Sequence, residues 1–453
     1  MSPPLSYRQH FAAVVALGLP LVGSHVAQFL LTLTDTILIG WYDVEALAAG
    51  NLAGGVFFVF LIFGAGFGWA VMPLVATAHA KGDATEVRRA TRMGLWLSAL
   101  FSVACLPVFL FARPIFLWLG QTEVVATLAQ DYLRIAGFAI MPGLFVMVMK
   151  SYLAALGRAN AVLWITLIAV PVNFAANWLL IFGNWGFPEL GIRGAAIATV
   201  ATSLLSAILT ALYAVRTMPE HQLFVRLWRP DWEAFRTVFR LGLPIGLTAL
   251  AEVGLFTASS VMMGWLGTLP LAAHGAALQI SSMTFMVHLG LSNVATIRAG
   301  QALGHGNRTD LVRGSVTVLF CSGVAVAGTV ALFLLAPEPL IGIFTDPDDP
   351  NRGAVIAIGA GLLAAAALFQ LVDAAQVIGI GLLRGLQDTR VPMIVAAFSY
   401  WGVGLATAYV LGFVLGWGGV GIWLGLAAGL GVASVALMAR FWTVGLARIQ
   451  SPA

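Results

Sequence analysis

Long apolar stretches, separated by short polar ones, cover almost the whole chain. An α-helix needs roughly 20 predominantly apolar residues to cross the hydrocarbon core of a bilayer. The pattern therefore predicts twelve membrane-spanning helices, near residues 12–40, 46–76, 93–112, 132–156, 161–183, 191–215, 237–265, 271–300, 314–336, 354–383, 391–416 and 418–439. The predicted fold class is an all-α integral membrane protein.

The beginning of the chain recurs in its second half. Residues 17–89 align with residues 241–313 at a constant offset of 224, without a gap and with 17 identities over 73 positions. Leu17-Gly18-Leu19-Pro20 returns as Leu241-Gly242-Leu243-Pro244, and Gly40-Trp41 returns as Gly264-Trp265. In a membrane chain, such a duplication is typical of a transporter built from two matching halves around a central path.

Each half holds six of the predicted spans. Because this number is even, both halves have the same orientation and are related by an axis along the membrane normal. The predicted domains are an N-terminal six-helix lobe at 1–215, a cytoplasmic linker at 216–236 and a C-terminal six-helix lobe at 237–453.

Composition and charge agree with a membrane location. The chain is 60% hydrophobic and only 9% charged, far below the roughly 25% of a soluble domain. If both ends face the cytoplasm, 19 of the 23 Lys and Arg residues lie on the cytoplasmic side, as the positive-inside rule requires. The sequence pI near 9.3 then reflects topology, and no nucleic-acid partner is expected.

Three carboxylates lie inside predicted spans, away from the interfaces: Asp35, Glu252 and Asp373. A charge in the bilayer costs roughly 2.5–3.5 kcal/mol or more unless it faces a polar cavity, so these residues are candidates for function. Glu252 aligns with Gln28 in the repeat, so only the second half carries a charge at this position. This asymmetry predicts a cation-coupling site at Glu252 and Asp373 that could bind Na⁺ or a proton.

Polar side chains near these acids extend the candidate set. Asn173 and Asn177 are one helical turn apart and could join Asp35 in a second cation site, because carboxylate and amide oxygens suit small hard cations. The other secondary candidates for cation or substrate binding are Gln28, His25, Thr199, Gln370 and Gln376. Such groups also serve as hydrogen-bonding contacts between helices, and this alternative stays open.

Four apolar side chains predict the wall of a substrate cavity. Met283, Phe285 and Met286 in the eighth segment, and Phe369 one turn before Asp373, suit ligands of variable shape. Ordinary core packing explains the same pattern.

One loop carries a family resemblance. Leu383-Arg384-Gly385-Leu386-Gln387-Asp388-Thr389-Arg390-Val391-Pro392 resembles the LRGxxDTRxP loop of the multidrug and toxic compound extrusion (MATE) family. Segments around Pro73–His79, Gly191–Ala196 and Gly300–Gly306 are similar to further landmarks, so the likeness spans nearly the whole chain. Thr77 departs from the first-half motif, which often has Gln there.

The resemblance implies two six-helix lobes around a V-shaped central cavity. It also implies a monomer of the bacterial inner membrane that exports cationic amphipathic drugs by alternating access, in exchange for Na⁺ or H⁺, and that confers antibiotic resistance. Glu252 and Asp373 look like the second-lobe acids of the NorM branch, and Asp35 matches the acid of its first helix.

Three other classes of protein are compatible with twelve membrane spans or with a related fold, and the sequence argues against each. A major facilitator carrier lacks support because residues 79–92 do not contain its GxxxDRxGRR pattern. A lipid-linked oligosaccharide flippase of related fold needs Arg or Lys in its cavity to hold a diphosphate, whereas Lys150 and Arg298 fall near helix ends, which predicts an acidic cavity. For an enzyme, no HExxH, GxSxG or phosphate-cradling motif appears, and no cofactor is expected.

Overall fold

The computed structural model describes residues 4–449, and within them it is helical, with no β-strand. Twelve helical segments of this part are long and apolar enough to cross a membrane. They are α1 (Tyr7–Tyr42), α2 (Val44–Ala80), α3 (Ala84–Leu110), α5 to α6 (Glu123–Ala155), α7 (Ala159–Phe182), α8 (Ile192–Thr217), α9 (Trp232–Leu266), α10 (Thr268–His305), α11 (Arg308–Leu335), α13 (Arg352–Gly385), α14 to η5 (Arg390–Val414) and α16 to η6 (Gly418–Gly445). The predicted twelve-span, all-α fold is confirmed.

Several of these segments are composite. The fourth joins α5 (Glu123–Ala136), the 3₁₀ turn η1 (Gly137–Ala139) and α6 (Ile140–Ala155). The eleventh consists of α14 (Arg390–Ala397), the π-helical η4 (Phe398–Leu405), α15 (Ala406–Tyr409) and the π-helical η5 (Val410–Val414), and the twelfth joins α16 (Gly418–Arg440) to η6 (Phe441–Gly445). The short connecting elements are α4 (Arg113–Trp118), η2 (Asn184–Gly186), η3 (Pro219–His221) and α12 (Pro337–Gly342).

Two helices begin about nine residues before the predicted spans because polar caps extend them beyond the apolar run. The Asp83 side chain accepts a hydrogen bond from the Glu86 backbone nitrogen and starts α3 at Ala84. Thr122 caps α5 in the same way through Val125. Side-chain caps satisfy backbone N–H groups that have no partner within the helix.

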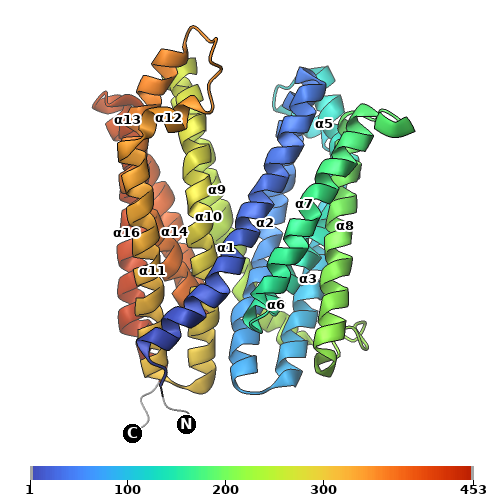
Figure 1. Cartoon of the computed structure of the whole chain (residues 1–453), viewed down its shortest axis with the longest axis vertical. Coiled ribbons are helices and arrows are strands. Elements are labelled where there is room, and N and C mark those ends of the chain that lie inside the picture. The colour runs from blue at the N-terminus through green and yellow to red at the C-terminus, as the bar shows by residue number, and fades with distance from the viewer. Residues whose placement is uncertain (1–3, 450–453) are drawn as a thin grey trace. The chain divides into compact units, whose positions relative to one another are not determined.

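The chain packs as two compact units, defined here as the α2–α8 unit (Gly23–Gly246) and the α10–α16 unit (Leu247–Ala453 with Met1–Val22). Helices α1 and α9 each contribute residues to both units. Within the α2–α8 unit, α2 packs on α3 and α6, and α7 runs along α8; within the other, α13 packs against α10, α11 and α16 (Figure 1). The lobe boundaries and the V-shaped cavity inferred from the sequence stay predictions.

Residues related by the 224-residue repeat take equivalent places within their own units. Asp83 caps α3, and its counterpart Asn307 caps α11 by accepting a hydrogen bond from the Asp310 backbone nitrogen. Arg89 contacts the segment that begins α9, while its counterpart Arg313 donates to the Leu5 carbonyl oxygen, just before α1. The duplication in sequence is therefore also a duplication of contacts.

The start of α9 is fastened to α3 by arginines. Arg89 donates to both carboxylate oxygens of Asp231, at 2.5 and 3.2 Å, and to Glu233 at 2.7 Å. These hydrogen bonds hold the pKa of the Asp231 carboxyl below its usual range. One turn along α3, Arg92 donates to the carbonyl oxygens of Gln222 and Leu223, each at 2.6 Å.

The loop that carries the family resemblance is held by a buried carboxylate. Asp388 accepts from Arg440 Nε at 2.9 Å and pairs with Arg448 at 3.1 Å. Gln387, just before it, has a φ of 59°, in the left-handed region. The motif therefore ties the end of α13 to the C-terminal helical segment of the same unit.

Candidate functional site

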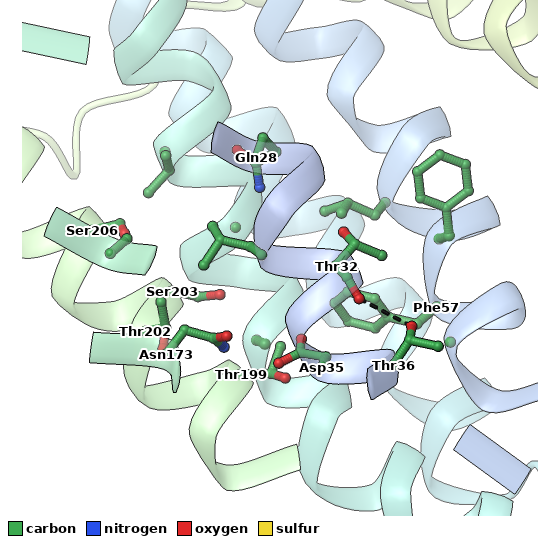
Figure 2. A pocket seen from close by; sticks show the side chains of 18 of the residues that line it. Gln28, Thr32, Asp35, Thr36, Phe57, Asn173, Thr199, Thr202, Ser203 and Ser206 are labelled. Carbon is green, nitrogen blue, oxygen red and sulfur yellow. Dashed lines mark hydrogen bonds between the residues drawn. The ribbon is translucent and has the colours of Figure 1, made fainter. Parts of the chain in front are cut away.

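A cavity of about 430 Å³ lies within the α2–α8 unit. Its polar lining comes mainly from three elements: Gln28, Thr32, Asp35 and Thr36 of α1, Asn173 of α7, and Thr199, Thr202, Ser203 and Ser206 of α8 (Figure 2). Apolar walls are supplied by Phe57, Phe58, Leu61 and Met147, among others. A space of this size is in the range of small-molecule sites.

Asp35 is held in this cavity by amide side chains. Asn177 Nδ2 donates to Asp35 Oδ1 at 2.6 Å, and Asn173 is a further hydrogen-bond partner of the carboxyl. Both asparagines are buried, with exposed fractions of 2% for Asn173 and 0% for Asn177. Their amide oxygens accept no hydrogen bond from the described residues. A carboxylate beside two unshared amide oxygens is a donor set that suits a small hard cation.

Thr199 and Tyr132 complete the surroundings of Asp35. Figure 2 shows Thr199 beside Asp35, on the facing helix α8. Its hydroxyl donates to the Ala195 carbonyl oxygen at 3.0 Å and is also a hydrogen-bond partner of Tyr132, which lines the same cavity. The structure thus brings together Asp35, Asn173 and Asn177, which the sequence suggested for a second cation site, and Thr199, a secondary candidate.

The polar lining of α8 was only partly found from the sequence. Thr199, Thr202, Ser203 and Ser206 are spaced as i, i+3, i+4 and i+7, which places them on one helix face. This spacing is visible in the sequence, but hydroxyl groups also bond within their own helix, so the pattern alone does not distinguish a cavity from packing.

The position of Lys150 shows that the prediction of an acidic cavity was wrong for this unit. The sequence placed it near a helix end and inferred an acidic cavity, but Lys150 lines the same cavity as Asp35. Its ammonium group donates to Gln28 Oε1 at 3.0 Å. His25, another candidate, interacts electrostatically with Lys150. The cavity of this unit therefore carries both signs of charge.

The α10–α16 unit contains a much smaller chamber, of about 50 Å³. It is lined by Glu252, Phe256, Leu278, Ser282, Phe285, Phe369 and Asp373. Asp373 is 2% exposed, and its Oδ1 has no hydrogen-bond partner among the described residues. The two carboxylates interact electrostatically, so the predicted pairing of Glu252 with Asp373 occurs in the structure.

The aromatic and amide neighbours of this chamber hold its helices together. Phe369 packs edge-on against Phe256, with ring centroids 5.9 Å apart, and against Trp423 at 5.4 Å. Gln370 Nε2 donates to Thr284 Oγ1 at 2.8 Å, and Gln376 Nε2 donates to the Tyr400 hydroxyl at 2.5 Å. These amides lie behind the chamber and not on its wall.

Two predicted cavity residues are placed elsewhere. Met283 is 49% exposed, and neither it nor Met286 is among the residues lining the chamber, whereas Phe285 and Phe369 are. The assignment of the methionines to a substrate cavity stays a prediction. In the part of the chain that the structure describes, no group of three or more His, Cys, Asp or Glu residues is arranged to hold a metal ion.

Comparison with known proteins shows the family to which this chain belongs. The MatE family model matches residues 20–179 and 244–410. The probable multidrug resistance proteins NorM of Rhizobium meliloti and Agrobacterium fabrum are 46% and 45% identical to the chain, over 96% of it and 94% of each relative.

Solved structures agree in fold. The eukaryotic MATE transporter AtDTX14 superposes with a TM-score of 0.87 at 18% identity, covering 98% of both chains. A MOP superfamily transporter from Pyrococcus furiosus, described as having a binding pocket of reverse polarity, gives a TM-score of 0.85 at 19% identity over the full length of both chains. These likenesses show the fold alone.

The chain is therefore a multi-pass membrane transporter and not an enzyme. It belongs to the MatE family of multidrug efflux transporters, with NorM proteins among its relatives.

Proposed function

We propose that the protein is a secondary active exporter of cationic amphipathic compounds, driven by inward movement of Na⁺ or H⁺ through alternating access. We place it in the bacterial inner membrane as a monomer with both termini cytoplasmic. The single observation that carries this proposal is the Asp35 carboxylate in a drug-sized cavity, bonded to Asn177 beside two amide oxygens without partners.

Coupling follows from competition for that carboxylate. An unneutralised charge in the bilayer costs roughly 2.5–3.5 kcal/mol or more, so Asp35 favours a bound proton, metal cation or organic cation. Each of these neutralises the same charge, and binding of one lowers the affinity for the others reciprocally. An inward-moving ion would therefore release the drug.

The chamber at Glu252 and Asp373 fits a complementary role. At about 50 Å³ it has room for an ion with little hydration and not for a drug-sized molecule. Two facing carboxylates share a proton or a cation more readily than they both remain charged and free. We assign this chamber to the coupling ion alone.

A flippase for lipid-linked oligosaccharides is the second candidate, and Lys150 is the observation in its favour. A diphosphate requires several Arg or Lys donors. The described lining of the larger cavity offers one lysine and one carboxylate. This balance favours the exporter.

Equilibrium binding of a fluorescent cation tests the proposal. The affinity of ethidium for the purified transporter in nanodiscs is measured by anisotropy while Na⁺ replaces choline, and separately while the pH falls. We expect one of the two titrations to weaken binding, and Asp35→Asn to abolish that dependence. The exporter hypothesis would be wrong if the affinity for ethidium changed with neither Na⁺ nor pH. It would also be wrong if a lipid diphosphate bound more tightly than ethidium.

A further inference from the structure

Lys150 is a charged group in the larger cavity that drug-cation exchange does not use. It lies on α6, and Gly143, Met147 and Lys150, which all line the cavity, fall on one face of that helix at i, i+4 and i+7. The side chain therefore faces the cavity as part of its wall.

The lysine and the carboxylate stand apart. Lys150 bonds to Gln28, and Asp35 lies seven residues further along α1, on the same helix face. At a rise of 1.5 Å per residue, the two levels are roughly 10 Å apart. Figure 2 shows Gln28 and Asp35 at these two levels of one helix. This spacing is too great for an ion pair, so each charge has capacity for a ligand.

The end of the cavity at Lys150 is built to donate hydrogen bonds. An ammonium group has three N–H donors, and Gln28 Oε1 accepts a hydrogen bond from one of them. Gln28 accepts through its oxygen, which leaves its own NH₂ group to donate. A ligand carboxylate beside these residues could accept hydrogen bonds from both the Lys150 ammonium and the Gln28 amide. Hydrogen bonds to a charged group are stronger than those between neutral groups.

We propose that Lys150 and Gln28 form an anion subsite, so that the cavity of the α2–α8 unit takes zwitterionic amphiphiles. The ligand carboxylate lies at Lys150, its ammonium or delocalised cation lies at Asp35, and its aromatic body packs on Phe57, Phe58 and Met147. This proposal rests on the proposed function, which supplies the role of Asp35, and adds the two side chains that would select for a ligand with a carboxylate.

A matched pair of dyes tests the subsite. Rhodamine 110 carries a free carboxylate, and rhodamine 123 is its methyl ester, so they share a cationic ring system and differ in the anion. Binding of each is measured by anisotropy in nanodiscs for the wild type, Lys150→Met, Lys150→Arg and Asp35→Asn.

The subsite predicts opposite shifts for the two dyes. Lys150→Met should weaken binding of the acid about tenfold or more, because a hydrogen-bonded charge partner is lost, and should strengthen binding of the ester, because a repelling cation is removed. Lys150→Arg should restore the preference for the acid. Asp35→Asn should weaken both dyes.

Two results would overturn the subsite. If Lys150→Met changes both affinities in the same direction, or if Lys150→Arg does not restore binding of the acid, Lys150 has a structural role only. Should Lys150→Met not fold, Gln28→Leu replaces it: this variant should weaken binding of the acid and leave binding of the ester nearly unchanged, because it removes a hydrogen-bond donor and keeps the Lys150 charge. The ester has no carboxylate, so its binding and the effect of Asp35→Asn on it test the proposed function alone. The anion subsite can therefore fail while cation binding at Asp35 is confirmed, and the reverse.

Discussion

Gly66 of α2 lies against Gly246 of α9, so closely that a Cβ on Gly66 would come within 2.5 Å of the Gly246 backbone nitrogen. The repeat counterparts Gly290 and Val22 make the same contact in the other unit, where a Cβ on Gly290 would lie 2.9 Å from the Val22 backbone nitrogen. Small residues allow helices in membranes to approach at such distances. The contact of α2 with α9 in one unit is therefore equivalent to the contact of α10 with α1 in the other.

Enlarging either glycine should separate those helices. We expect Gly66→Val and Gly290→Val to lower the melting temperature and the yield of monodisperse protein, because backbone atoms cannot move aside as a flexible side chain can. Gly323→Val is the matched control, since its added Cβ would meet nothing within 4 Å. If all three variants had the same melting temperature in a thermal-shift measurement, the close helix contacts at Gly66 and Gly290 would not contribute to stability.

The acids of the smaller chamber should affect coupling more than folding. Glu252→Gln and Asp373→Asn each remove a buried negative charge, which lowers the cost of insertion. We expect normal expression and gel-filtration profiles, with gradient-driven efflux reduced roughly tenfold or more. Dye counterflow without an ion gradient measures the remaining exchange. Wild-type pumping by both variants would show that the chamber does not carry the coupling ion.

Asp35 should be more important for ligand binding than for helix packing. Asp35→Asn should weaken binding of a cationic dye by roughly tenfold or more, since a charge-assisted contact is lost. Leu19→Ala, an exposed position on the same helix, is the control and should have little effect. If the two variants lost dye affinity to a similar degree, α1 would contribute to helix packing and not to ligand binding.

The attachment of α9 to α3 should weaken in acid. The pKa of Asp231 is lowered in the folded protein, so its contribution is complete above the pKa of the unfolded chain and is lost as the pH falls through the folded value. Asp231→Asn keeps a side-chain oxygen for the Ala234 backbone nitrogen but removes the charge. We expect pepsin, which is active in acid, to cleave the wild-type linker faster as the pH falls below about 4, after correction for its own activity, and to cleave the variant at a rate without that pH dependence. The same acid sensitivity in the variant would exclude Asp231 as its source.

The membrane spans and part of the candidate site could be predicted from the sequence, whereas the position of Lys150 could not. Hydropathy gave the twelve spans because the bilayer imposes one length on each of them. Asp35, Asn173 and Asn177 could be grouped because the two asparagines are one helical turn apart and all three offer oxygen ligands within predicted spans. Lys150 was misplaced because five residues from the end of α6 suggests an interface, and nothing in the sequence fixes how α6 is rotated toward α1.

Packing between distant segments was also beyond the sequence. The repeat suggests boundaries near the linker, but α1 and α9 each contribute to both compact units, a division that depends on contacts such as Gly66 with Gly246. The smaller chamber shows the same limit: Phe285 and Met286 are neighbours in sequence, yet only Phe285 lines it.

Gradient-driven transport in proteoliposomes decides whether the protein couples export of organic cations to inward movement of Na⁺ or H⁺. Proteoliposomes are given a fluorescent organic cation, and its movement is followed under a Na⁺ gradient alone and under a pH gradient alone, with the membrane potential clamped. We expect one of these gradients to drive the dye against its own concentration difference, and reversal of the gradient to reverse the flux. Movement of dye only down its own gradient, whichever ion gradient is imposed, would contradict cation-coupled export.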